Sequence, residues 1–245
     1  MRKAYSVRSM FLTVQGEGSR TGAKSLFVRL AGCNLWDGHP EHRASGKGAC
    51  ARWCDTDFAQ GEPMPLAKLL DSMNALSPRT GSESRWCVIT GGEPTLQMDL
   101  ALVEGLHREG WSVALETNGT LDPVSEGTRV LDQVDHICCS PKRGGEVVIR
   151  HAHELKVVLP GDALQPWTEG ELLSFYEKLH PDAAFVQPQD AIDPSRTETS
   201  FLGGQRPEAE MREVYQGNVR RCLDFVYAHP AWRLSLQTHK YLGVP

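Results

Sequence analysis

Short, strongly apolar runs alternate along this chain with segments of helical periodicity. Runs that are apolar almost throughout are typical of strands covered on both faces, and alternation of strand with helix is typical of parallel βαβ units. The strand-like runs are residues 25–30, 86–90, 112–116, 136–140, 154–159 and 184–187, and the helical segments are 66–76, 100–109, 167–180 and 208–229. The pattern predicts an α/β fold with parallel strands, and the 245 residues suit a single domain spanning 1–245.

Polar and glycine-rich residues follow five of these six runs. Because active sites of barrel-like α/β folds lie at the carboxyl ends of the strands, we expect these residues to converge on one face. They are Gly32-Cys33-Asn34, Gly91-Gly92-Glu93-Pro94, Thr117-Asn118-Gly119, Pro141-Lys142 and Pro188-Gln189-Asp190. Residues 190–206 read as a long polar loop or a lid.

Cysteine placement indicates a metal centre rather than disulfides. The chain has 7 cysteines, an odd number, and only Cys33, Cys50 and Cys54 lie among Gly, Asn, Asp and Thr. Three thiolates can hold three irons of a four-iron cluster and leave the fourth iron open, whereas a closed structural metal site normally has four protein ligands. The remaining cysteines lie in apolar stretches and are predicted to be small buried hydrophobes: Cys87, Cys138, Cys139 and Cys222.

One alternative reading and one additional feature accompany this cysteine loop. A zinc knuckle completed by His39 or His42 would use the same thiols. Asp55-Thr56-Asp57 follows the last cysteine and adds hard oxygen ligands, which suit Mg²⁺ better than a soft metal.

Composition limits the partners. Hydrophobic residues make up 40% and charged residues 23%, and the net charge is −5 with no run of Lys or Arg longer than a pair. That pattern argues against nucleic-acid binding and favours a small-molecule substrate. No apolar window approaches a membrane span and no apolar segment follows the basic N-terminus, so we expect no membrane partner and a cytoplasmic location.

The turn Thr90 to Pro94 has the composition of a ligand-binding turn. Its two glycines would let a ligand approach bare backbone and would leave N–H groups free for a carboxylate, while Glu93 could accept from an ammonium group.

Together these segments resemble the radical S-adenosylmethionine superfamily and, more narrowly, the 7-carboxy-7-deazaguanine synthase family of the queuosine pathway. The supporting segments run in order through nearly the whole chain. They are 14–18 (VQGEG), 27–36 (FVRLAGCNLW), 54–58 (CDTDF), 90–94 (TGGEP), 116–119 (ETNG), 140–142 (SPK) and 237–245 (QTHKYLGVP).

The resemblance implies a partial TIM-like barrel with about six parallel strands, an abridged radical SAM core and a homodimer. It also implies a cluster loop at 33–54 and a C-terminal tail at 233–245 that completes the substrate site. By resemblance, Cys33, Cys50 and Cys54 are ligands of a 4Fe-4S cluster and Thr56 is a ligand of Mg²⁺. The implied S-adenosylmethionine contacts are Gly92, Glu93, Ser140, Pro141, Lys142, Gln187, Pro188, Gln189 and Asp190, and the implied substrate contacts are Val14, Gln15, Gly16, Arg29, Thr90 and the terminal carboxylate of Pro245.

One spacing departs from the family pattern. The family has two residues between its second and third cysteines, whereas residues 51–53 separate Cys50 from Cys54 here, and Ala51 stands where the family cysteine would align. We keep Cys50 as the ligand, reached through a differently shaped turn, with His39 and His42 as substitutes.

The resemblance implies conversion of 6-carboxy-5,6,7,8-tetrahydropterin to 7-carboxy-7-deazaguanine. One electron, supplied by a donor such as flavodoxin or ferredoxin, would split S-adenosylmethionine, and the resulting radical would take hydrogen from C6 of the pterin before ring contraction and loss of ammonia. Two other readings stay open. They are a radical activase that acts on a partner protein, and a non-catalytic zinc or iron–sulfur module.

Overall fold

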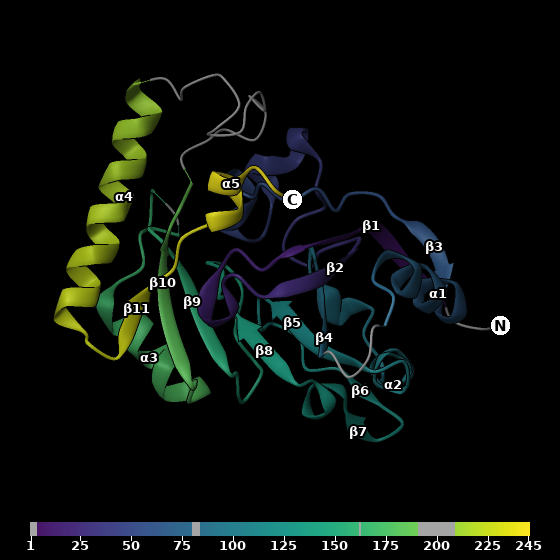
Figure 1. The fold of residues 1–245 in the computed structure, drawn as a ribbon. Coiled ribbons are helices and arrows are strands. Elements are labelled where there is room, and N and C mark those ends of the chain that lie inside the picture. The colour runs from purple at the N-terminus through teal and green to yellow at the C-terminus, as the bar shows by residue number, and fades with distance from the viewer. Residues whose placement is uncertain (1–3, 80–83, 162, 191–208) are drawn as a thin grey trace.

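A nine-stranded, mostly parallel sheet forms the centre of the described structure (Figure 1). The computed structural model describes residues 4–79, 84–161, 163–190 and 209–245, without the side chains of 209–211. The strand order is β11-β10-β9-β8-β5-β4-β2-β1-β3, and every neighbouring pair from β2 to β11 is parallel, whereas β1 pairs antiparallel with both β2 and β3. The strands are β1 (Ala4–Val14), β2 (Lys24–Leu30), β3 (Glu62–Pro65), β4 (Arg85–Gly91), β5 (Trp111–Thr117), β8 (His136–Cys139), β9 (Glu154–Leu159), β10 (Ala183–Pro188) and β11 (Trp232–Leu234).

Helices pack beside these strands, and a small two-stranded sheet, β6 (Val124–Ser125) with β7 (Thr128–Arg129), stands apart. In Figure 1, α3 and α4 flank the β9 to β11 end and α1 lies at the opposite end. The helices are α1 (Leu66–Leu76), α2 (Leu100–Arg108), α3 (Glu169–Leu179), α4 (Ala209–Ala228) and α5 (Thr238–Leu242). Short 3₁₀ turns are η1 (Gly18–Arg20), η2 (Pro40–Ser45), η3 (Ala49–Arg52), η4 (Pro94–Leu96) and η5 (Val130–Gln133).

Local chemistry explains where two of the helices begin. The Asp99 carboxylate accepts from the Leu102 N–H at 3.0 Å, which satisfies an orphan donor at the start of α2. Thr168 and Glu171 form a reciprocal capping box at the start of α3, and His180 ends that helix in the left-handed region.

All six predicted strands and all four predicted helices are confirmed to within two residues. The predicted strand count is wrong, because three further strands join the sheet. Arg8 and several polar residues interrupt the hydrophobic pattern of β1, and β3 and β11 are too short to show one. Barrel closure is not seen, since the described sheet ends at β11 and β3. The supposed lid at 190–206 lies outside the described residues except for Asp190.

Side chains alternate between two faces of the parallel sheet. One face carries an extensive core cluster that includes Leu26, Ile89, Leu115 and Val157. The other face carries polar side chains toward the strand ends, where Arg29 on β2 lies beside Thr90 on β4. Because side chains alternate with a period of two, one face of each strand can build the core while the other builds a site.

The four remaining cysteines are buried, as the sequence predicts. Cys87, Cys138, Cys139 and Cys222 are at most 2% exposed, as expected of buried hydrophobes.

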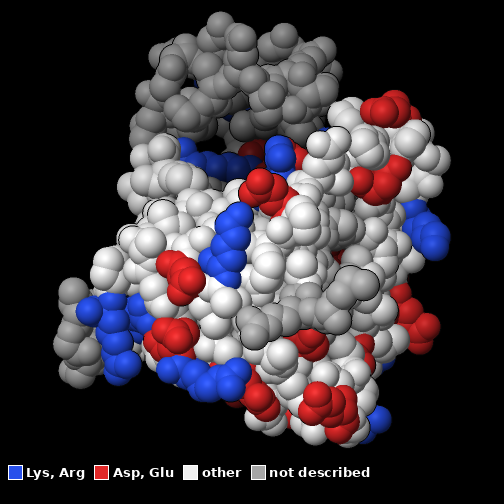
Figure 2. All heavy atoms as spheres, turned by 90° about the vertical axis from the view of Figure 1, so that its right-hand side faces the viewer, with Lys and Arg blue, Asp and Glu red and all other residues white. Residues whose placement is uncertain are grey.

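The surface carries charges of both signs. On the face shown in Figure 2, acidic and basic side chains are interspersed. Among the described helices, none combines the length and apolar character that crossing a membrane requires.

Candidate active site

A cavity of about 840 Å³ opens at the carboxyl ends of the parallel strands and collects most of the predicted site residues. Its walls come from the ends of β2, β4, β5, β9 and β10, from the cysteine loop, and from segments near both ends of the chain. The predicted residues that line it are Val14, Gln15, Gly16, Arg29, Cys33, Cys50, Cys54, Thr56, Thr90, Gly92, Ser140, Lys142, Gln187 and Pro245. Residues from seven separate segments thus meet in one space.

A tight 3₁₀ turn accommodates the unusual spacing between Cys50 and Cys54. Cys50 lies in η3, and the Cys54 N–H donates to the Cys50 carbonyl at 2.7 Å, so both thiols face the cavity. Ala51 is fully buried, packs with Trp36 and Phe58, and is absent from the cavity lining. Cys50, and not the position where the family cysteine would align, therefore lines the cavity.

The three thiols share one electrostatic environment. The pKa of Cys50 is raised to about 12, chiefly by burial; Lys142 lowers it, and the neighbouring Cys54 and Cys33 raise it. The pKa values of Cys33 and Cys54 are also raised, chiefly by burial. Three thiols that line one cavity can still serve as iron ligands, because bound metal makes coordinating thiols lose their protons.

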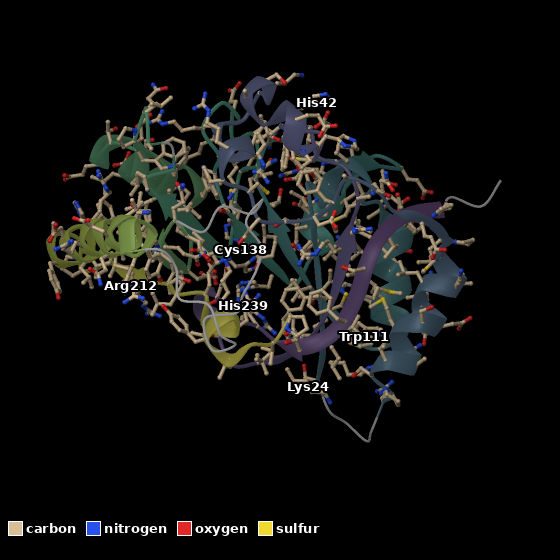
Figure 3. All side chains as sticks on the ribbon, turned by 90° about the horizontal axis from the view of Figure 1, so that it is seen from above. Lys24, His42, Trp111, Cys138, Arg212 and His239 are labelled. Carbon is tan, nitrogen blue, oxygen red and sulfur yellow. The ribbon has the colours of Figure 1, made fainter. Side chains whose placement is uncertain are left out.

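The donor set does not match a site for one metal ion. In the described part of the chain, no three or more His, Cys, Asp or Glu side chains stand close enough to hold one ion. His42 binds Asp37 and neither His39 nor His42 lines the cavity. Figure 3 shows His42 at the outer edge of the molecule, away from Cys138 and His239. A four-iron cluster binds each thiolate at a different iron, so it accepts a wider spacing than a single ion.

The two glycines after β4 allow close contact with the end of β2. A Cβ on Gly91, whose φ is 141°, would stand 2.0 Å from the Leu30 carbonyl oxygen, and one on Gly92 would stand 2.2 Å from the Gly32 carbonyl oxygen. No side chain fits there. The two glycines therefore allow the turn at the end of β4 to pack against the end of β2, the strand that precedes Cys33.

Glu93 lies behind the cavity and is 1% exposed. Its carboxylate accepts from the Thr117 hydroxyl at 2.8 Å and from the Asn118 N–H at 2.7 Å, and it also accepts from Thr95. Burial raises its pKa, against these hydrogen bonds. The side chain thus ties the ends of β4 and β5 together.

Four more predicted cofactor contacts also lie outside the lining residues. They are Pro141, Pro188, Gln189 and Asp190. Gln189 donates its N–H to the Leu159 carbonyl at 2.7 Å, and the Asp190 carboxylate binds Lys240.

A buried ionic network at the cavity floor escaped the sequence prediction. Lys156 is 4% exposed, and its ammonium lies 2.5 Å from the Glu17 carboxylate and 3.2 Å from that of Glu116. Burial alone would lower the pKa of Lys156, but the negative groups around it raise it well above its ordinary value. Glu17 is partly buried, and although burial would raise its pKa, Lys156 lowers it to about 2. The signal in the sequence was the pair Glu154 and Lys156, two positions apart in an otherwise apolar strand.

The N-terminal loop and the C-terminal tail close one side of the cavity together. The Gly16 carbonyl accepts from both the backbone N–H and the hydroxyl of Thr238 at 2.9 Å, and Gln237 donates to Glu17 at 2.9 Å. His239 lies so close that a Cβ on Gly16 would stand 2.1 Å from its Nδ1. This contact explains why residue 16 is glycine.

Arg29 supplies a partly buried cation to the cavity. Burial lowers its pKa, whereas Asp55 and the Cys54 thiol oppose that shift. Its guanidinium carbon lies 5.8 Å from the centre of the Phe11 ring, which itself stacks on Phe27. A planar guanidinium group beside a flat aromatic ring suits a planar anionic ligand.

The chain is similar to known proteins over nearly its full length. It is 40% identical to the 7-carboxy-7-deazaguanine synthase of Burkholderia multivorans over 98% of this chain and 99% of that protein, and 39% identical to that of Bordetella pertussis over 99% and 100%. The crystal structure of QueE from Escherichia coli superposes with a TM-score of 0.61 at 25% identity, covering 96% of this chain and 95% of that one. No model of a known protein family matches the chain.

An α/β sheet that gathers three thiols at its carboxyl edge, in a chain with these relatives, defines a radical S-adenosylmethionine enzyme. Such enzymes hold a 4Fe-4S cluster and S-adenosylmethionine. Within this class, the chain belongs to the 7-carboxy-7-deazaguanine synthase family.

Proposed function

We propose that this chain converts 6-carboxy-5,6,7,8-tetrahydropterin to 7-carboxy-7-deazaguanine with loss of ammonia, as a step of queuosine biosynthesis. The observation that carries the proposal is the single cavity that brings three thiols together with a cationic and an anionic set of side chains. Relatives at 39–40% identity carry the name of this activity. When bound, the cluster and S-adenosylmethionine supply the radical chemistry, and the protein supplies binding, orientation and exclusion of water.

The cysteine side of the cavity holds the cofactors in this proposal. Cys33, Cys50 and Cys54 bind the cluster. The bare backbone at Gly92 and the side chains of Ser140, Lys142 and Gln187 orient S-adenosylmethionine. Lys142 donates to the Ser140 hydroxyl at 2.6 Å, and its ammonium lies 5.5 Å from the centre of the Trp53 ring. That position gives a cation close to the thiols and beside an aromatic wall, which suits an anionic, partly aromatic ligand.

The substrate lies on the other side. Arg29 binds the pterin carboxylate, because a guanidinium forms paired hydrogen bonds with a carboxylate. Gln15, Gly16 and Pro245 contact the ring, and Val14 and Thr90 border it. All of these residues line the same cavity as the thiols. The substrate would therefore lie against the cofactor without a path through bulk water.

Thr56 is the proposed ligand for Mg²⁺, which would bridge the protein and the substrate carboxylate. It lines the cavity between Asp55 and Asp57. Replacing Thr56 by Val removes the hydroxyl and keeps the shape. We expect Mg²⁺ to stimulate turnover less in the variant than in the wild type, measured as rate against metal concentration. Equal stimulation of both proteins would contradict this role.

The proposal includes an electron donor of the flavodoxin or ferredoxin type, a homodimer and a cytoplasmic location. All 7 cysteines are free thiols, which fits a reducing compartment.

Anaerobic reconstitution with iron and sulfide tests the proposed function. We expect a brown protein that cleaves S-adenosylmethionine under dithionite and forms 7-carboxy-7-deazaguanine from the carboxylated tetrahydropterin. Cofactor cleavage without turnover of the pterin would point to an activase. A protein that bound only zinc would point to a non-catalytic module.

A further inference from the structure

Lys240 connects three segments that are far apart in sequence, and two of its three linked residues, Asp55 and Lys240 itself, line the cavity. It lies in α5, and its ammonium is 2.7 Å from the Asp55 carboxylate and 2.7 Å from the Asp190 carboxylate. Asp55 directly follows the cluster cysteine Cys54, whereas Asp190 follows β10. In Figure 1, α5 lies close to the cysteine loop above β1 and β2.

The segment that Lys240 holds lies outside the helices and strands. Residues 55–57 have no regular secondary structure. The contacts of this segment include a second cation, Arg8, on the Asp57 carboxylate, and hydrogen bonds from Thr56 to the Cys54 thiol. Earlier parts of the loop are better anchored, since Arg43 donates to the Ala51 and Cys54 carbonyls at 2.6 and 3.1 Å.

The helix that carries Lys240 is itself anchored on the opposite side. Thr238 binds the Gly16 carbonyl, and the Tyr241 hydroxyl lies 3.2 Å from that of Tyr215 on α4. Its neighbours therefore fix the position of Lys240 without the cysteine loop. An ammonium held in that way can order a loop that approaches it.

We propose that Lys240 is a positioning residue that couples the order of the cysteine loop to docking of the C-terminal tail. Loosening either segment would then loosen the other. The link to a bound cluster rests on the proposed function, whereas the coupling between the two segments does not.

Hydrogen–deuterium exchange on the full chain without iron tests the coupling directly. Lys240→Met removes the charge and keeps the apolar stem, Lys240→Arg keeps the charge, and Lys68→Met makes the same charge change at an exposed position on α1. We expect Lys240→Met to speed exchange about threefold to tenfold in residues 50–58 and in residues 237–245, because a lost ion pair raises the population of the open state. Lys240→Arg should restore most of the protection, and Lys68→Met should match the wild type.

Two further measurements sharpen the test. Since the three groups are partly exposed, 1 M salt should shrink the difference between the wild type and Lys240→Met. In the reconstituted protein, Lys240→Met should lose iron to a chelator several-fold faster. Faster exchange confined to residues 237–245 would overturn the proposal, as would unchanged exchange in both segments. Neither result depends on whether the protein turns over a pterin.

Discussion

Individual side chains decide which thiols face the cavity. The spacing between Cys50 and Cys54 indicated an irregular turn, and the structure shows how that turn works: Ala51 is buried against Trp36 and Phe58 while Cys50 faces the cavity. The sequence singled out the three cysteines that line the cavity, because their polar neighbours differ from the apolar surroundings of the others. It could not predict the direction of Ala51, because that depends on packing between segments distant in the chain.

Cys50→Ala should therefore abolish the cluster, and adding Ala51→Cys should not restore it. The new thiol would replace a buried methyl group that packs against Trp36 and Phe58 and does not line the cavity. Iron and sulfide counts after anaerobic reconstitution measure both variants. Cys222→Ala, which removes a buried thiol outside the cavity lining, should keep its iron. Recovery of the cluster in the double variant would show that the turn reshapes.

Lys156 is the clearest residue that sequence reasoning missed. A single lysine in an apolar strand carries little information by itself, since its partners Glu17 and Glu116 come from two other segments. Removing one member of a buried pair leaves the other charge without a partner, whereas removing both is milder.

Lys156→Met should lower the free energy of unfolding by about 3–5 kcal/mol. Lys156→Met combined with Glu17→Gln should lower it by less than the sum of the two single changes, because the pair is coupled. Urea unfolding of the wild type, Lys156→Met, Glu17→Gln and the double variant measures these free energies. A loss below about 1 kcal/mol in Lys156→Met would mean that the ammonium is not held in this network.

At the scale of elements, the parallel strands and the helices were predictable because their apolar periodicity is local. β1 was not, since it is an antiparallel strand with mixed burial, and its pairing with β2 and β3 decides that it is a strand. The role of the turn after β4 was likewise only partly predictable from local sequence. Its glycines suggested ligand binding, while the structure also requires them for contact between neighbouring strand ends.

Gly92→Ala tests that contact. The added Cβ would stand 2.2 Å from the Gly32 carbonyl oxygen and 2.8 Å from the Cys33 Cβ, so the turn or the cysteine must move. We expect a loss of about 1–3 kcal/mol in stability, together with a lower iron content. Gly170→Ala, on α3 with open space around it, should change stability by less than about 1 kcal/mol and leave the iron content unchanged. A Gly92→Ala protein with full stability and full iron would refute the close contact.

At the scale of the whole molecule, segments near the two ends of the chain finish the cavity. No local sequence pattern predicts that Gly16 contacts Thr238 and His239, because that contact depends on the complete sheet. Resemblance to a family assigned Gln15, Gly16 and Pro245 to the site, and the structure brings all three to the cavity. What each of them binds stays a proposal.

Acid should destabilise the molecule over a defined pH range. The pKa values of Glu17 and Glu154 lie at about 2 instead of 4.5. A lowered folded-state pKa contributes stability above the ordinary value, and that stability is lost as the pH falls from about 4.5 toward 2. Each carboxylate contributes at most about 3 kcal/mol, and the raised pKa of Glu93 opposes them. The midpoint of thermal unfolding should fall across this range, and less steeply in Glu17→Gln. A midpoint independent of pH between 4.5 and 2.5 would contradict this assignment.

The pairing of Gly16 with Thr238 also has a consequence for how the enzyme is made. Synthesis proceeds from the N-terminus, so a nascent chain displays its cysteine loop long before α5 exists. The thiols then lack the neighbouring wall that residues 237–240 form until those residues leave the ribosome. Iron delivered before that moment would meet an unfinished cavity, and iron delivered afterwards would meet the complete one.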